Sequence, residues 1–150
     1  DFDRPLNQRG LKAAPLIGSV TAQRGLRPDV IISSPAKRAM QTAALVKDAS
    51  GSTSPIRYDS RIYEAVVGTL ALIISEIDDN NASAMIVGHN PGMEGLIEFL
   101  TGTRESMPTS ALASVSLTID AWADVGPRCG TLQFIIRPKD EMRASADSDK

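Results

Sequence analysis

Two stretches of this sequence place residues suited to anion chemistry between a predicted strand and a predicted helix. IISSPAKRAMQTA contains Arg38, and MIVGHNPGMEGL contains His89, the only histidine, directly before Asn90. Each combines an apolar run, a polar residue able to cap a helix, and a proline suited to the first helical position. Both turns should direct backbone N–H groups and the positive end of a helix dipole to one edge of a sheet. Together with a guanidinium and an imidazole, they indicate an anion site, with phosphate as the leading candidate.

Each of these features alone has a simpler interpretation. A single histidine at a strand end is often a capping or surface residue, and Arg38 alone would be a solvated helix residue. Asn-Pro and Ser-Pro are ordinary helix starts. The pairing of two similar turns is what favours the anion site.

The elements that position these turns alternate between helices and strands. Helical spacing of apolar residues predicts helices at 8–24, 33–50, 66–78 and 91–102, the second with Ser34 as its N-cap and Pro35 at its first helical position. Continuous apolar runs predict strands buried on both faces at 29–33 and 82–88. Residues 56–65 suggest a short strand or extended connection, and 112–120 with 130–137 suggest two antiparallel strands.

This alternation predicts one α/β domain with a mostly parallel central sheet and helices on both faces. In such sheets, ligands bind outside the carboxyl ends of the strands, where both turns lie. Pro15 is expected to kink the first helix or to mark its true first turn. The polar segment 139–150 is expected to be a disordered tail.

The composition excludes several classes of protein. The chain has 150 residues, of which 42% are hydrophobic and 23% charged, and its net charge of −2 without a basic block argues against nucleic acid as a partner. No apolar stretch approaches the ~20 residues of a transmembrane helix. One cysteine, Cys129, gives neither an internal disulfide nor a metal site, so we expect a reducing compartment, the cytoplasm, and no metal or cofactor.

Five stretches together resemble the histidine phosphatase superfamily, most of all its phosphohistidine phosphatase branch, the SixA type. They occur in the family's order and spacing: DFDRPLNQRG, DVIISSPAKRAMQTA, RIYEA, MIVGHNPGME and MPTSALA. The resemblance implies a three-layer, phosphoglycerate-mutase-like domain over 1–138 without a lid, followed by the tail at 139–150.

The resemblance also implies a phosphoryl-transfer pocket without metal. Arg38 and His89 match the phosphate-binding arginine and the second histidine of the family, which stabilise charge during transfer. Glu64 lies where relatives often carry a proton donor, although an exposed loop carboxylate is an equal interpretation. Arg4 and Asn90 are expected to contact substrate at the mouth of the pocket.

The sequence departs from the family at the nucleophile. In the family, an Arg-His pair on the first strand supplies the histidine that becomes phosphorylated, and this sequence contains no such pair. His89 cannot be both nucleophile and partner. Two explanations stay open: the chain is a piece of a longer active protein, which we favour, or a natural short form that binds phosphate without turnover. Losing an interior strand would leave two neighbouring strands unpaired, a large cost against a net stability of about 5–15 kcal/mol.

The short stretch between Glu64 and His89 leaves no room for a lid. An open pocket suits a phosphoryl group on another protein, such as a histidine phosphotransfer domain. A small phosphate ester and a non-catalytic phosphate-binding module are the alternatives. We expect a monomer, with neither nucleic acid nor membrane as partner.

Overall fold

The computed structural model describes residues 1–148, with side chains described up to residue 143. The helices are α1 (Gln8–Gln23), α2 (Lys37–Ser50), α3 (Val67–Ser75), α4 (Gly92–Thr101) and α5 (Pro138–Ser148). Short 3-10 turns occupy Ser60–Ile62 and Trp122–Asp124. The strands are β1 (Val30–Ser33), β2 (Ile56–Tyr58), β3 (Ala84–Val87), β4 (Leu112–Leu117) and β5 (Gly130–Ile136).

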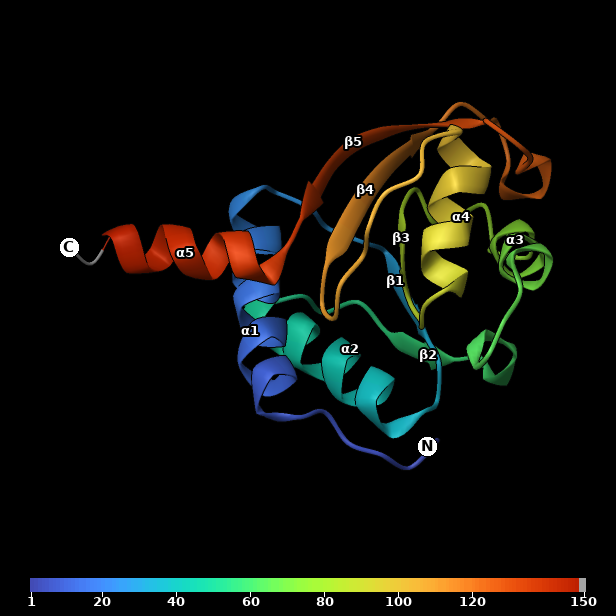
Figure 1. Ribbon diagram of the computed structural model, residues 1–150. Helices are drawn as coiled ribbons and strands as arrows, with labels where there is room; N and C mark the ends of the chain where they lie inside the picture. The colour runs from blue at the N-terminus through green and yellow to red at the C-terminus, as the bar shows by residue number, and fades with distance from the viewer. Residues whose placement is uncertain (149–150) are drawn as a thin grey trace.

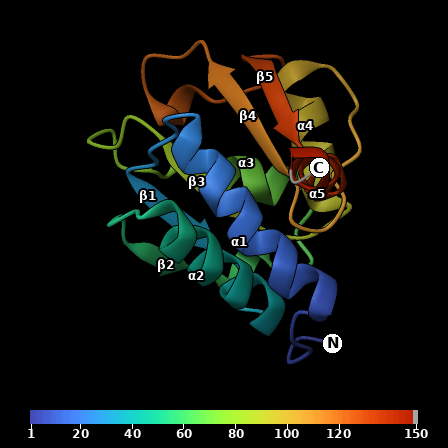
Figure 2. The ribbon, with the colours of Figure 1, turned by 90° about the vertical axis from the view of Figure 1, so that its left-hand side faces the viewer.

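The predicted α/β arrangement of a parallel sheet with helices on both faces is confirmed. β1, β2 and β3 form a parallel sheet in the order β2-β1-β3, with Ile31 of β1 opposite Ile56 and Met85 (Figure 1). The view of Figure 2 places α1 and α2 in front of this sheet and α3 behind it. β4 and β5 pair antiparallel, as predicted, with Leu112 opposite Ile136.

A cleft separates the two sheets. In the described part of the chain, β3 pairs with β1 along one edge only. The cleft beside its other edge is lined by every residue of β3 and β4 and has a volume of about 950 Å³. All residues of β1 are buried, whereas all four of β3 are only half-buried. The prediction that β3 is buried on both faces is therefore wrong, because β3 borders the cleft.

The larger apolar cluster fixes β1 against α3 and α4. Its buried members are Val30, Ile32, Ile62, Leu70, Ile73, Ile74, Ile77, Leu96 and Leu100. A smaller cluster joins α1 to β5 through Ile17, Val20 and Ile136. Each fully buried Leu or Ile contributes about 1.5–3 kcal/mol, and these side chains hold the strand ends that carry the candidate site.

Both predicted helix starts after the strands lie too early in the chain. α2 begins at Lys37, with Ala36 as its N-cap, rather than at Pro35. The Ser34 N–H donates to Val87 O at 2.9 Å and so continues the strand ladder, which keeps the chain extended through Ser34. α4 likewise begins at Gly92, with Pro91 as its N-cap.

Residues 138–148 form α5, where the polar composition suggested a disordered tail. Pro138 occupies the first helical position, and Asp140 and Glu141 lie in the first turn, where carboxylates interact favourably with the helix dipole. Residues 149–150 of the predicted tail lie outside the described residues.

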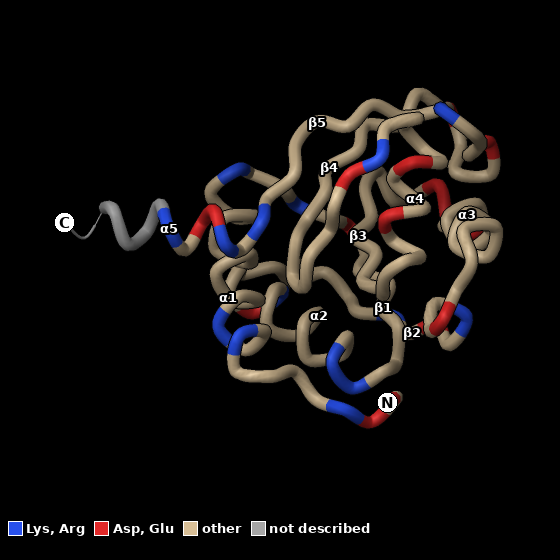
Figure 3. Tube along the Cα trace, viewed as in Figure 1, with Lys and Arg blue, Asp and Glu red and all other residues tan. Residues whose placement is uncertain are grey.

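Charged residues of both signs are distributed along the chain. Figure 3 shows basic positions on α1 and α2 and acidic positions on α4. Within residues 1–148, no helix is both long and apolar enough to cross a membrane.

A glycine allows α1 to pack closely on α2. A Cβ atom on Gly18 would lie 2.6 Å from Val46 O and 2.8 Å from the Ala49 Cβ. The backbone oxygen cannot move without shifting α2. The α1–α2 layer therefore depends on the missing side chain.

We predict that Gly18→Ala lowers the free energy of unfolding by about 1–3 kcal/mol, as overpacking does in a close-packed interior. Urea denaturation measures this change. Gly68→Ala on α3 is the matched control, because nothing lies within 4 Å of its added Cβ, and helix propensity should make it neutral or more stable by up to ~1 kcal/mol. A Gly18→Ala chain as stable as Gly68→Ala would contradict the close contact.

Candidate active site

A backbone hydrogen bond joins the carboxyl ends of β1 and β3. Ser34 N–H donates to Val87 O at 2.9 Å, just beyond the paired residues Ser33 and Val87. His89 follows Val87 closely, and Arg38 lies in the first turn of α2. The two turns identified in the sequence therefore meet at one edge of the sheet.

The His89 imidazole is half-buried and is contacted from two directions. Its Nε2 lies 2.8 Å from Ser34 Oγ. The Tyr63 ring meets it edge to face, with centroids 5.6 Å apart, and Phe2 packs on Tyr63 in the same way at 5.2 Å. Aromatic pairs of this kind contribute about 0.5–1.5 kcal/mol beyond their burial. These contacts restrict the orientation of the imidazole.

Burial lowers the pKa of His89 below its ordinary value of about 6.5, and the nearby Arg38 charge lowers it further. The imidazolium loses hydration when buried and is repelled by the guanidinium. Since the folded chain binds this proton less readily than the unfolded chain, protonation destabilises the fold. The contribution of neutral His89 to the free energy of unfolding is therefore fully present above pH ~6.5. It is lost as the pH falls through the lower pKa of the folded chain.

Two guanidinium groups converge on one carboxylate. Arg38 NH2 lies 3.3 Å from Asp1 Oδ2, and its NH1 donates to Asp1 O at 2.9 Å. Arg4 Nε donates to Asp1 Oδ1 at 3.1 Å. The Arg38 side chain is 19% exposed and that of Arg4 is 61% exposed. Arg38 is therefore the more buried of the two guanidinium groups that bind the Asp1 carboxylate.

Asn90 has a structural role in addition to its predicted contact with substrate. Its Nδ2 donates to Met107 O, and its Oδ1 accepts from Glu94 N at 3.2 Å. Glu94 Oε2 in turn accepts from Met107 N at 2.7 Å. Asn90 and Glu94 thus fix the segment around Met107 against the start of α4.

The cleft brings together four of the five predicted site residues. Arg4, Arg38, His89 and Asn90 line it, and Glu64 is not among its lining residues. Glu64 is exposed and has a φ of 55°, in the left-handed region that is unfavourable for residues other than glycine. It adjoins Tyr63 in the chain, so the backbone holds Glu64 close to the site without directing it into the cleft.

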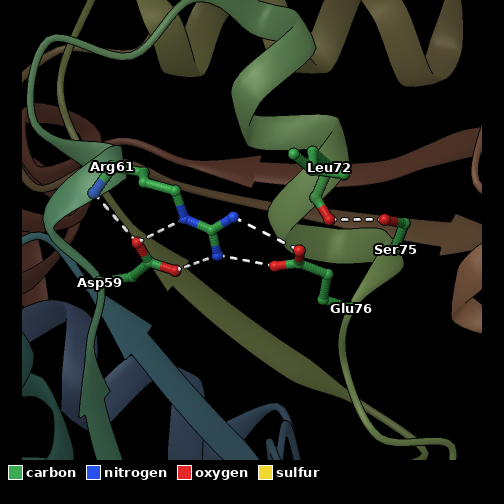
Figure 4. A network of polar contacts seen from close by, with 5 residues as sticks. All are labelled: Asp59, Arg61, Leu72, Ser75 and Glu76. Carbon is green, nitrogen blue, oxygen red and sulfur yellow. Dashed lines mark hydrogen bonds and ion pairs between the residues drawn. The ribbon is translucent and has the colours of Figure 1, made fainter.

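An ion-pair network supports the loop that presents Tyr63 (Figure 4). Arg61 NH2 lies 2.7 Å from both Asp59 Oδ2 and Glu76 Oε1, which links the end of β2 to the end of α3. Hydrogen bonds from Arg61 lower the pKa of both carboxyl groups and raise that of Arg61 itself. Asp59 N also donates to Ser33 O at 2.9 Å. The loop is therefore anchored to both β1 and α3.

Neither contact of the imidazole is predicted by the sequence. Its pattern predicts only a helix cap for Ser34 and no role for Tyr63 or for Phe2, which packs on Tyr63. Aromatic residues make up only 4% of the chain, and one of them, Tyr63, meets its single histidine edge to face. That scarcity was the available signal.

The part of the chain that the structure describes holds no group of three or more His, Cys, Asp or Glu side chains placed to bind a metal ion. The polar groups next to the His89 ring are the Ser34 hydroxyl and the Arg38 guanidinium. Such donors stabilise negative charge directly through hydrogen bonds.

The chain is similar to known proteins over most of its length. Residues 1–89 match the model of the histidine phosphatase superfamily (branch 1). An uncharacterised protein of Mycobacterium tuberculosis is 34% identical over 143 residues, which span 88% of this chain and 87% of that protein.

Two solved structures share the fold. One is the proposed phosphohistidine phosphatase SixA of Agrobacterium tumefaciens, with 32% identity, a TM-score of 0.79, and coverage of 92% of this chain and 86% of that one. The other is the proposed phosphohistidine phosphatase SixA of Nakamurella, with 26% identity, a TM-score of 0.77, and coverage of 92% and 87%.

We predict that Arg38→Gln raises the pKa of His89 but leaves it below ~6.5, because the like charge is removed while burial remains. NMR titration measures this directly, since His89 is the only histidine of the 150 residues. Lys37→Gln makes the same charge change at the exposed neighbouring position and should leave the pKa unchanged. If the pKa of His89 were the same in Arg38→Gln as in the unmodified chain, Arg38 would not lie close enough to His89 to act on its charge.

Proposed function

The chain belongs to the histidine phosphatase superfamily, branch 1, and we propose that it hydrolyses phosphohistidine on a partner protein through a covalent phosphohistidine intermediate. The turns that carry Arg38 and His89 meet where Ser34 N–H donates to Val87 O at 2.9 Å, and the Arg38 charge lowers the pKa of His89. This proximity is the observation that carries the proposal. The Asp1 carboxylate, held by Arg38 and Arg4, marks a position where an anion is bound.

The proposed division of roles follows from charge. Arg38 binds two equatorial oxygens of the phosphoryl group, and His89 donates one hydrogen bond to it. A nucleophilic imidazole nitrogen attacks phosphorus, the P–N bond to the substrate breaks, and the departing imidazole takes up a proton. Water then hydrolyses the enzyme phosphohistidine and releases phosphate. Glu64 is proposed as a proton donor, and an imidazole leaving group tolerates the distance of Glu64 from the cleft because it requires little acid assistance.

We place the nucleophilic histidine upstream of Asp1, on a strand between β3 and β4. The cleft there is bordered by two strand edges and by apolar side chains of α4, including Leu96 and Leu100. Ser110 also lines the cleft, and its buried Oγ has no hydrogen-bond partner within residues 1–148. A strand in this position would satisfy the facing backbone groups, which are costly to leave buried and unpaired.

A partner protein is the favoured source of the phosphoryl group. The stretch between Glu64 and His89 is occupied by α3 and β3, which leaves no room for a lid between these two residues. An open site admits a phosphohistidine on the surface of a phosphotransfer domain. The SixA descriptions of the two solved relatives support this substrate class. We further propose that the protein acts as a monomer in the cytoplasm, and we retain small phosphate esters as alternative substrates.

A second candidate is a module that binds phosphate without turnover. One observation favours it: the 150 residues contain a single histidine, so this chain alone has no pair of nucleophile and partner. Phosphate release separates the two candidates.

We predict that the chain preceded by its natural upstream segment releases phosphate from a phosphohistidine protein. Arg38→Ala should lower the single-turnover rate constant at least ~10²-fold, because it removes stabilisation of transition-state charge. The assay is single-turnover dephosphorylation followed by gel or by ³¹P NMR. Lys37→Ala is the matched control, since it removes a neighbouring charge that does not line the cleft.

Two outcomes would contradict the proposal. The first is turnover by residues 1–150 alone that disappears in His89→Ala, which would place the nucleophile within this chain. The second is an Arg38→Ala rate equal to that of Lys37→Ala, which would remove Arg38 from the pocket.

A further inference from the structure

The Ser34 hydroxyl is completely buried between two partners. Ser34 has 0% of its surface exposed. Its Oγ accepts a hydrogen bond from Ala36 N at 3.2 Å and lies 2.8 Å from His89 Nε2. The Ser34 backbone is also engaged, because its N–H donates to Val87 O and its carbonyl accepts from Ser33 Oγ.

The hydrogen-bonding capacity of a hydroxyl determines where the proton lies. Serine has one O–H donor and two acceptor lone pairs, and the Ala36 N–H occupies one of the lone pairs. A buried O–H without an acceptor costs about 1–3 kcal/mol. Of the two partners of Ser34 Oγ in the described residues, Ala36 N is a donor and only His89 Nε2 can accept. The Ser34 proton therefore points at Nε2.

We propose that Ser34 is a positioning residue that fixes His89 as its Nδ1–H tautomer and leaves Nδ1–H as the hydrogen-bond donor to the bound anion. A neutral imidazole has one ring proton, so an Nε2 that accepts from Ser34 requires the proton on Nδ1. Tyr63 limits rotation of the ring, which keeps Nε2 on Ser34.

The surroundings of His89 favour the neutral imidazole that this tautomer requires. Burial and Arg38 lower its pKa, so the ring is neutral near pH 7. Arg38 then supplies the positive charge, and His89 supplies a directed neutral donor. Contact of Nδ1–H with a phosphoryl oxygen rests on the function proposed above, whereas the tautomer rests on Ser34 alone.

The tautomer can be measured by NMR on the full chain labelled with ¹⁵N-histidine, with His89→Ala used to assign the signals. At pH 8, Nδ1 should resonate as a protonated, pyrrole-type nitrogen and Nε2 as an unprotonated, pyridine-type nitrogen. In Ser34→Ala, the proton should redistribute toward Nε2. Ser33→Ala is the matched control, because that buried hydroxyl bonds to Ser34 O rather than to His89, and it should keep the original spectrum.

Phosphatase kinetics of the chain preceded by its natural upstream segment supply a second measurement. Ser34→Ala should lower kcat/KM about tenfold, equivalent to ~1.4 kcal/mol, and Ser33→Ala should leave it near the unmodified value. Circular dichroism and thermal unfolding verify that both variants fold. If Ser34→Ala does not fold, the spectrum of the unmodified chain alone decides, since it reports the tautomer directly.

A pyrrole-type Nε2 in the unmodified chain would overturn the proposal, as would a Ser34→Ala spectrum identical to that of Ser33→Ala. Failure of the proposed function gives a different result: the Nδ1–H tautomer would be observed, yet His89→Ala would bind inorganic phosphate as tightly as the unmodified chain. In that case the assignment of Ser34 stands and the phosphate site does not.

Discussion

The candidate site depends on one backbone hydrogen bond, from Ser34 N–H to Val87 O. This bond continues the β1–β3 ladder one residue beyond the last strand pair, so both chains leave the sheet at the same place. It brings Ser34 Oγ within 2.8 Å of His89 Nε2, and it delays the start of α2 to Lys37. Arg38 consequently projects from the first helical turn beside the cleft.

Charge is divided unequally within the site. Arg38 keeps its positive charge, while burial and the proximity of Arg38 lower the pKa of His89 and keep its imidazole neutral near pH 7. A phosphoryl group then meets one cationic fork and one neutral donor whose direction is fixed by Ser34. Fixed donors of this kind stabilise developing charge without reorganising during the reaction. Protonation of His89 at low pH would lower the free energy of unfolding, because the ring is partly buried and lies near Arg38.

Sequence periodicity was sufficient for the α/β class, the parallel strands and the antiparallel pair, because apolar burial dictates these features locally. The placement of Arg38 and His89 at one edge followed from the rule for carboxyl ends of parallel strands. The contacts of Ser34 and Tyr63 with the imidazole could not be predicted, since they join residues far apart in the chain. The direction of Ser34 depends on the β1–β3 register, and that of Tyr63 depends on the loop that Arg61 holds. The half-buried state of β3 was not predicted, because an apolar strand has the same sequence pattern whether or not its second edge is paired. α5 was missed because polar composition conceals its favourable Pro138 start and acidic first turn.

In the proposed function, Arg38 and His89 hold one phosphoryl group together. A double-mutant cycle on the binding of inorganic phosphate, measured by titration calorimetry for the unmodified chain, Arg38→Ala, His89→Ala and the double variant, tests it most directly. We expect weaker binding in each single variant and a coupling energy of about 0.5–3 kcal/mol between the two positions. Unchanged phosphate affinity in either single variant, or losses that simply add in the double variant, would contradict it.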